Sequence, residues 1–177
     1  PADIPYLHAD PGSAARWRAD RGPGLNVGLV WAGNPDHARD RHRSLPFAAV
    51  QPLLALPNVT WHVLQPQIPA PVAETLRGLP QLRLPGPTFG DFADTAACVD
   101  GLDLVVTADT SVAHLAGAMG KPVWLMLAQS ADFRWLRGRD DSPWYPTARL
   151  FRQDRRGDWA GVIAQLLAAL PRFRPHA

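Results

Sequence analysis

The densest group of chemically capable side chains lies in one short segment, Asp109-Thr110-Ser111-Val112-Ala113-His114. The apolar run before this segment predicts a buried strand that ends near Asp109, and the small residues after it predict a helix. Thr110 and Ser111 could cap that helix and leave its first backbone N–H groups free. Because a helix N-terminus carries positive potential and unpaired donors, the segment predicts an anion site within reach of the His114 ring. The plainer alternative is that Asp109 only caps the helix and that His114 is a core histidine.

A second candidate follows the first apolar run, in Trp31-Ala32-Gly33-Asn34-Pro35. Gly33 permits a tight turn or a close approach of the backbone to a ligand, and Asn34 tolerates left-handed geometry. The pattern is neither G-x-G-x-x-G nor a P-loop, which argues against a dinucleotide site or a Walker-type triphosphate site. On these residues alone, an ordinary turn between a strand and a helix is the favoured interpretation.

A basic run, His37-Ala38-Arg39-Asp40-Arg41-His42-Arg43, continues this loop. Arginine forks fit phosphate oxygens in two-point contacts, but most positions of a charge run are simply solvated. Arg43 is the best candidate, because it adjoins the predicted helix start at Ser44-Leu45-Pro46, where a fixed backbone would hold it in place.

The hydrophobic pattern indicates the elements that must position these groups. Short apolar runs alternate with amphipathic stretches of helix length, which is typical of βα units and a parallel sheet. The predicted strands are Asn26–Trp31, Val59–Leu64, Gln81–Leu84, Leu104–Thr107, Pro122–Leu127 and Ala148–Phe151. The predicted helices are Pro46–Ala55, Pro71–Gly78, Phe92–Gly101, Thr110–Gly120 and Asp158–Leu170. We therefore expect an α/β fold with a doubly wound, six-stranded parallel sheet.

In such a sheet, ligands bind at the carboxyl ends of the strands, where the strand order reverses. The longest loop without periodicity, Ala128 to Pro146, interleaves arginines with aromatic side chains, among them Arg134, Trp135, Trp144 and Tyr145. Contact with a sugar or another domain and local packing under the loop are equally good interpretations.

Composition limits the classes of function. The chain has 177 residues and a net charge of +2, an excess too small to indicate nucleic-acid binding by itself. No apolar stretch approaches the roughly 20 residues of a membrane-spanning helix. The single cysteine, Cys98, excludes an internal disulfide and is compatible with the cytoplasm. No clustered set of carboxylate, histidine or cysteine ligands predicts a metal site.

Residues 1–24 are rich in proline around a short candidate helix, Ser13–Ala19, and indicate an arm or linker that leads into one domain over residues 25–177. Because no basic or apolar leader follows Pro1, we expect Pro1 to mark a junction inside a longer protein.

Two stretches resemble a known family. The stretch from Asp109 to Ala118, with Gly120-Lys121-Pro122-Val123 behind it, is similar to the D-T/S-G-x-x-H-x-x-x-A signature of glycosyltransferase family 9, the heptosyltransferases, which have GT-B architecture. The stretch from Val27-Gly28-Leu29 through Gly33-Asn34 to Arg43-Ser44-Leu45-Pro46 resembles that family's strand, phosphate loop and K-x-W-P element. Together the matches run from about Leu25 to Leu170.

The resemblance implies the C-terminal, Rossmann-like half of a GT-B enzyme, which would bind a nucleotide-diphosphate sugar without a metal or other cofactor. The positions that it assigns to the donor phosphates are Gly33, Asn34, Arg43, Asp109, Thr110, Ser111 and His114. It places the base and ribose near Gln65, Pro85 and Gly86. It assigns acceptor or interdomain contact to Arg134, Trp135, Trp144 and Tyr145. Ser111 departs from the family's glycine and Arg43 from its lysine, and both keep the capacity to donate hydrogen bonds.

The family's N-terminal acceptor domain, with the expected catalytic base, is absent, so we expect this chain alone to be inactive. The long Trp135 to Pro146 segment looks like the version found after tetratricopeptide repeats in large bacterial proteins, and an acceptor domain and such repeats are the expected partners. A non-catalytic GT-B-like interaction module of a repeat protein is the main alternative. Half of a sugar-nucleotide epimerase is a further one, although it needs acid and base carboxylates that we cannot place.

Overall fold

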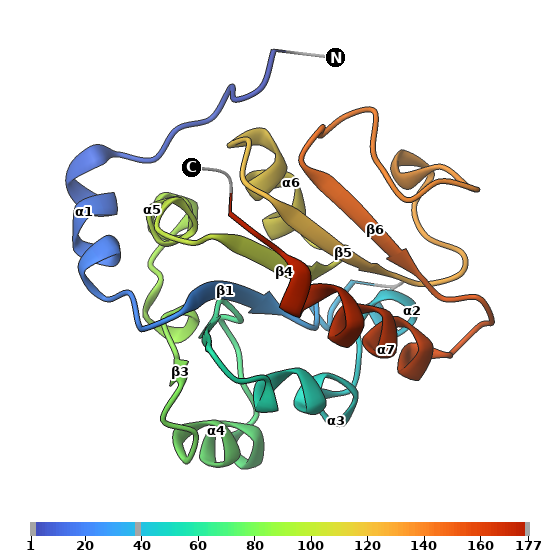
Figure 1. Ribbon diagram of the computed structural model, residues 1–177, viewed down its shortest axis with the longest axis horizontal. Helices are drawn as coiled ribbons and strands as arrows, with labels where there is room; N and C mark the ends of the chain where they lie inside the picture. The colour runs from blue at the N-terminus through green and yellow to red at the C-terminus, as the bar shows by residue number, and fades with distance from the viewer. Residues whose placement is uncertain (1–2, 38–39, 176–177) are drawn as a thin grey trace.

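The computed structural model describes residues 3–37 and 40–175, so that Pro1, the expected junction, and Arg39 of the basic run lie outside the described residues. Six parallel strands form one sheet in the order β3-β2-β1-β4-β5-β6 (Figure 1). The strands are β1 (Leu25–Val30), β2 (Val59–Val63), β3 (Leu82–Arg83), β4 (Leu104–Ala108), β5 (Val123–Leu127) and β6 (Ala148–Arg152). The predicted doubly wound α/β fold is confirmed, with each strand within one residue of its predicted ends.

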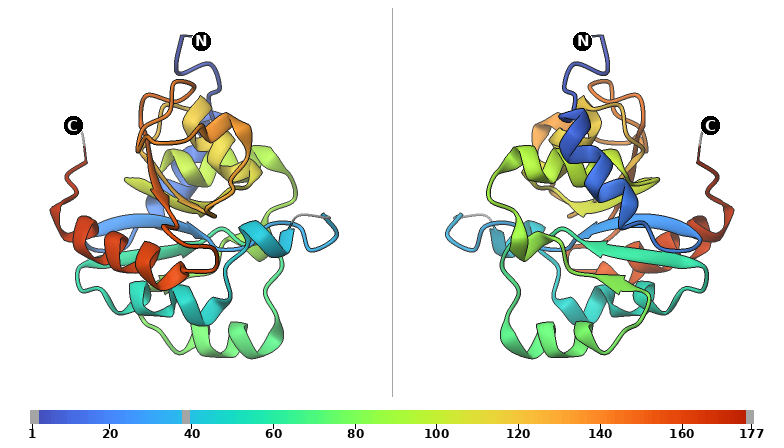
Figure 2. Two further views of the ribbon diagram at one scale, coloured as in Figure 1. Left: turned by 90° about the vertical axis from the view of Figure 1, so that its right-hand side faces the viewer. Right: turned by 90° about the vertical axis from the view of Figure 1, so that its left-hand side faces the viewer.

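Helices cover both faces of the sheet. The α-helices are α1 (Pro11–Ala19), α2 (Asp40–Arg43), α3 (Phe47–Val50), α4 (Ala70–Arg77), α5 (Phe92–Asp100), α6 (Ser111–Ala118) and α7 (Trp159–Ala169). Short 3₁₀ turns are η1 (Gln51–Ala55), η2 (Gly86–Thr88), η3 (Phe133–Trp135) and η4 (Leu170–Arg172). Figure 2 shows α3, α4 and α7 on one side of the sheet and α1, α5 and α6 on the other.

Alternate residues of β1, β4, β5 and β6 enter two separate cores. Val27 and Leu29 of β1 pack in the core under α3, η1, α4 and α7, whereas Val30 packs in the core under α5 and α6. Both cores are closed to solvent, which explains why the central strands read as continuous apolar runs in the sequence.

Two helical segments differ from the prediction. The predicted helix Pro46–Ala55 is divided into α3 and the 3₁₀ turn η1, because Pro52 has no N–H to donate to a carbonyl one α-helical turn earlier. The basic run, predicted as loop, contains the single turn α2.

The described part of the arm packs on the sheet domain. Ala14 of α1 is buried, and Asp10 caps that helix by accepting a hydrogen bond from Ser13 N–H at 2.8 Å. The guanidinium of Arg21 donates to both carboxylate oxygens of Asp103 at 2.8 Å, beside the start of β4. Among residues 3–37 and 40–175, no helix has the length and apolar character needed to cross a membrane.

Candidate functional site

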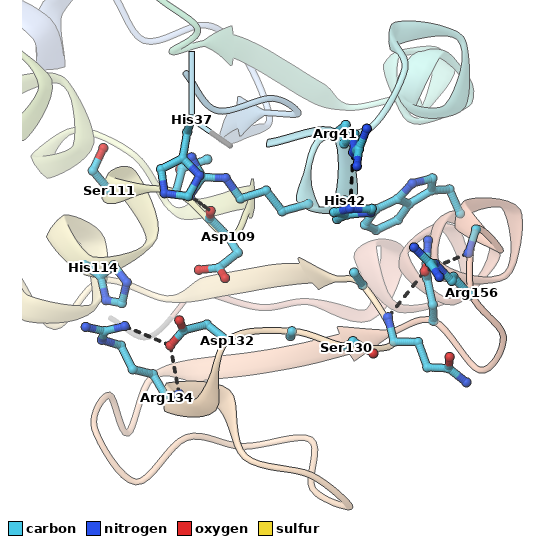
Figure 3. Close-up of a pocket in the computed structure, with 18 residues that line it drawn as sticks. His37, Arg41, His42, Asp109, Ser111, His114, Ser130, Asp132, Arg134 and Arg156 are labelled. Atoms are coloured by element: carbon cyan, nitrogen blue, oxygen red, sulfur yellow. Dashed lines mark hydrogen bonds and ion pairs between the residues drawn. The ribbon is translucent and has the colours of Figure 1, made fainter. Parts of the chain in front are cut away.

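A cleft of about 1060 Å³ opens at the carboxyl ends of β1, β4, β5 and β6. It therefore includes the place where β1 lies between β2 and β4 and the strand order reverses, as expected for a doubly wound sheet. Figure 3 shows Ser111, Asp109 and His114 at one end of the cleft and Arg41, His42 and Arg156 at the other. The cleft thus joins loops that are far apart in the sequence.

Arg43 is the first predicted site residue that the cleft contains. It ends α2 rather than preceding a helix start, since α3 begins only at Phe47. Its Nε donates to Asp40 Oδ1 at 3.2 Å, and its Nη1 donates to the backbone carbonyl of Asp109 at 3.0 Å. The prediction that a helix start would hold Arg43 is wrong in this detail, because an acidic partner and the carbonyl of Asp109, directly after β4, hold it instead.

Gly33 and Asn34 lie in the described loop after β1 but not on the cleft wall. The Gly33 N–H donates to Ser44 Oγ at 2.9 Å, and a Cβ at Gly33 would lie 2.5 Å from Asp40 Oδ1 and 2.6 Å from Arg43 Nη2. Asn34 accepts a hydrogen bond from Asp36 N–H at 3.0 Å. These contacts support the turn interpretation, in which Gly33 makes room for the Asp40–Arg43 pair.

Asp109, Thr110 and Ser111 lie where β4 passes into α6, and all three line the cleft. Thr110 is the N-cap residue by position, but its side chain does not cap the helix; its Oγ1 lies 3.1 Å from Thr107 Oγ1. Ser111 is exposed, so its side chain faces solvent at the cleft, whereas Val112 and Ala113 of the same turn are buried. A helix start of this kind offers unpaired N–H donors to an anion.

His114 lines the cleft from the first turn of α6 and is only half-buried. Its ring stacks on Trp135, with centroids 5.2 Å apart, and its Nδ1 lies 3.0 Å from the hydroxyl of Tyr145. Burial lowers the pKa of His114, while the nearby Asp109 carboxylate acts in the opposite direction. The ring is therefore a fixed, largely uncharged group at neutral pH.

The long loop after β5 forms the wall behind these residues. Trp135 is fully buried and its Nε1 donates to Asp109 Oδ1 at 2.8 Å, and Tyr145 is also buried. Of the two interpretations that the sequence left open for this loop, the burial of these two side chains favours local packing. Arg134 remains at the cleft, paired with Asp132, and Trp144 is 48% exposed.

Gln65, Pro85 and Gly86 are buried and do not line the cleft. Both polar atoms of the Gln65 amide bond to the Ala32 backbone: Oε1 accepts from its N–H at 3.2 Å, and Nε2 donates to its carbonyl at 3.1 Å. A Cβ at Gly86 would lie 2.3 Å from the Gln65 carbonyl oxygen. In this structure the three residues pack between the loops after β2 and β3, away from the cleft.

Sequence reasoning gave no specific role to the part of the cleft that follows β5 and β6. Its polar side chains come from α2, the β5 loop and the turn before α7: Arg41, His42, Gln129, Ser130, Gln153 and Arg156. Trp159 adds an indole ring at the start of α7. The signal that could have found them is position, because Gln153 lies two positions after the end of the sixth predicted strand.

The charges around the cleft favour an anionic ligand. Arg41, Arg43, Arg134 and Arg156 line it, against two carboxylates, Asp109 and Asp132. Within residues 3–37 and 40–175, no three histidine, cysteine or acidic side chains are grouped so that they could hold a metal ion.

The overall shape can be compared with a solved structure. The chain superimposes on E. coli ADP-heptose LPS heptosyltransferase II with a TM-score of 0.63 over 97% of its own length and 55% of that chain. The chain has a heptosyltransferase-type fold. At 15% identity the similarity concerns the fold alone, and it confirms the predicted Rossmann-like architecture of the GT-B type.

A curated relative is found by sequence. Over 176 residues the chain is 30% identical to Protein FlbA of Caulobacter vibrioides, a match that covers 95% of this chain and 29% of FlbA. The chain thus spans less than a third of the length of this relative. No protein-family model matches the sequence.

Proposed function

We propose that this chain is the part of a glycosyltransferase that binds the donor, a nucleotide-diphosphate sugar. The observation that carries the proposal is the convergence of Arg43, the start of α6 and His114 on one cleft at the reversal of strand order. Each of these groups can donate a hydrogen bond to phosphate oxygen, and they come from three separate positions in the sequence.

The diphosphate would lie at the α6 end of this cleft. Arg43 is already fixed by Asp40 and Asp109, so its guanidinium loses little side-chain freedom when an anion binds. The α6 N-terminus adds backbone donors, and Ser111 adds a hydroxyl. In a transfer reaction these donors would stabilise the charge that develops on the leaving diphosphate.

The carboxylates of the cleft favour a sugar over a nucleotide alone. Asp109 and Asp132 would repel a purely anionic ligand, but carboxylate oxygens accept hydrogen bonds from hydroxyl groups. Trp135 donates its Nε1–H to Oδ1 of Asp109, which leaves Oδ2 as the second acceptor atom of that carboxylate. This oxygen can therefore accept a hydrogen bond from a sugar hydroxyl next to the diphosphate.

The cleft is also larger than a diphosphate alone would fill. Its volume of about 1060 Å³ lies near the upper end of the range for small-molecule sites, roughly 300–1,000 Å³. The end formed by Arg156, Trp159 and the β5 loop would take the remaining part of the ligand. The catalytic base and the acceptor site belong, in this proposal, to the remainder of a longer protein.

Isothermal titration tests the proposal with ADP-, UDP- and GDP-sugars, and ADP-sugars come first because the structural neighbour is an ADP-heptose enzyme. One of them should bind, and Arg43→Ala should weaken it roughly tenfold or more through loss of a charge-assisted contact. Arg41→Ala should weaken it as well, without disturbing a buried contact. The matched control is Arg77→Ala, which removes an exposed charge from α4, outside the cleft.

The alternative of a non-catalytic interaction module has one structural observation in its favour. Phe133 and Trp144 are 74% and 48% exposed on the long loop, more than single-domain packing requires. If no nucleotide sugar binds at millimolar concentration while the folded chain still captures a partner through this loop, the module is the better description.

A further inference from the structure

The His114 ring is held on two sides by residues of the long loop. Its plane lies nearly parallel to the indole of Trp135, at an interplanar angle of 19°, and the ring of Tyr145 meets it edge-on with centroids 5.7 Å apart. The Tyr145 hydroxyl lies 3.0 Å from Nδ1. Rotation of the imidazole about its χ angles would therefore break a ring stack and a hydrogen bond together.

Tyr145 is itself fixed by close packing against α6. A Cβ at Gly117 would lie only 2.4 Å from Tyr145 Cγ, so the tyrosine ring fits because position 117 has no side chain. The carbonyl of Tyr145 accepts a hydrogen bond from Ala148 N–H at 2.9 Å, which ties the residue to the start of β6. The hydroxyl thus has a defined place relative to the first turn of α6.

We propose that Tyr145 is a positioning residue for His114. The Tyr145 hydroxyl donates to Nδ1 of His114 and so fixes the imidazole as the Nε2–H tautomer. That N–H is then directed to the anion in the cleft. The inference rests on the proposed donor site. It assigns Tyr145 a role in that site although the tyrosine does not line the cleft.

Electrostatics support this tautomer. Burial lowers the pKa of His114, so at neutral pH the ring has a single N–H, and only the Nε2–H form can both accept from a phenol and donate to a ligand. Burial, together with the hydrogen bond between the Tyr145 and Tyr6 hydroxyls, raises the pKa of Tyr145 to about 12, so the phenol keeps its proton. Because the phenol has one proton to give, the proposal has Tyr6 donating to Tyr145 Oη and Tyr145 donating to Nδ1. The charged groups that face His114 are Asp109, Asp132 and Arg134, of mixed sign.

Titration of the chain with inorganic pyrophosphate measures the effect without knowledge of the base or the sugar. Tyr145→Phe removes only the hydroxyl and should weaken pyrophosphate binding about three- to tenfold, the range for one hydrogen bond. The matched control is Thr75→Val, which removes one hydroxyl from α4, outside the cleft and away from Tyr145. This control should bind pyrophosphate as the wild type does.

A double-mutant cycle shows whether Tyr145 acts through His114. In a His114→Ala background, Tyr145→Phe should cause no further loss of affinity, whereas an equal loss in both backgrounds would overturn the inference. Nitrogen-15 NMR of the imidazole gives a second measurement that needs no variant. It should show the Nε2–H tautomer in the wild type, and a dominant Nδ1–H tautomer would contradict the proposal.

The two proposals fail in different ways. If the wild type binds no pyrophosphate, the donor-site proposal is lost and this inference with it. If the wild type binds pyrophosphate and Tyr145→Phe binds it equally well, the donor site stands and only the positioning role is wrong.

Discussion

The guanidinium of Arg43 donates to the backbone carbonyl of Asp109, 66 positions further along the chain, at 3.0 Å. The bond joins the end of α2 to the turn between β4 and α6. Because Arg43 also pairs with Asp40, its fork is occupied on two sides, and the loops that follow β1 and β4 are fixed relative to each other. The shape of the cleft at the reversal of strand order therefore depends on one side chain.

Arg43→Lys restores the residue type of the heptosyltransferase signature, and we expect it to be unfavourable here. A lysine ammonium is a point donor on a flexible stem and cannot occupy both Asp40 and the Asp109 carbonyl with the geometry of a guanidinium. The free energy of unfolding should fall by about 1–2 kcal/mol, and pyrophosphate binding should weaken. Urea unfolding and titration measure the two effects, with Arg77→Lys as the control; an unchanged midpoint would show that the carbonyl contact contributes nothing.

Gly33→Ala should destabilise the chain although Gly33 has no positive φ. The added methyl would lie 2.5 Å from Asp40 Oδ1 and 2.6 Å from Arg43 Nη2, so the Asp40–Arg43 pair must move. We expect a loss of about 1–3 kcal/mol in the free energy of unfolding, the usual cost of overpacking, and weaker binding in the cleft. Chemical denaturation gives the first value and pyrophosphate titration the second.

Gly12→Ala is the matched control for this substitution. Gly12 lies in the first turn of α1, and its nearest neighbour to a new Cβ is Asp10 Oδ1 at 3.4 Å, an ordinary contact. Because alanine has the higher helix propensity, this variant should be as stable as the wild type or slightly more stable. Equal destabilisation by both substitutions would mean that the crowding at Gly33 is not the cause.

The fold could be predicted from the sequence because its signals are local. Buried parallel strands appear as short apolar runs such as 27–31 and 104–106, and the helical stretches between them alternate without exception. The sequence also predicted that Arg43, Asp109 and His114 lie near one another, since the loops after different strands meet at the carboxyl edge of a doubly wound sheet.

The rest of the site depends on contacts between distant residues, which a single sequence does not reveal. Gln65 was expected at a ligand, but the Ala32 backbone occupies both ends of its amide. For Trp135 and Tyr145 the sequence left contact with a sugar or another domain and local packing as equal alternatives. Their burial depends on the space beside Gly117 and on the carboxylate of Asp109. Such complementarity appears only when the elements are packed together.

The stability of the chain should decrease between neutral and mildly acidic pH because of His62, a buried residue of β2. Its Nε2–H donates to Asn26 Oδ1 at 3.0 Å, and burial lowers its pKa from 6.5 to about 4. Asp20 and Asp103 oppose this shift while Arg83 and Arg21 add to it. Between these two pKa values the unfolded chain binds a proton that the folded chain does not, so the stability is complete above about pH 6.5 and is lost as the pH falls toward 4.

The loss from His62 should amount to roughly 3 kcal/mol, since each unit of pKa difference corresponds to about 1.4 kcal/mol. Urea unfolding at a series of pH values measures it. His114 changes stability in the same direction, so the decisive comparison is with His62→Gln, whose amide can still donate to Asn26. This variant should have a much flatter profile between pH 6.5 and 4, whereas an equally steep profile would assign the acid sensitivity to other groups.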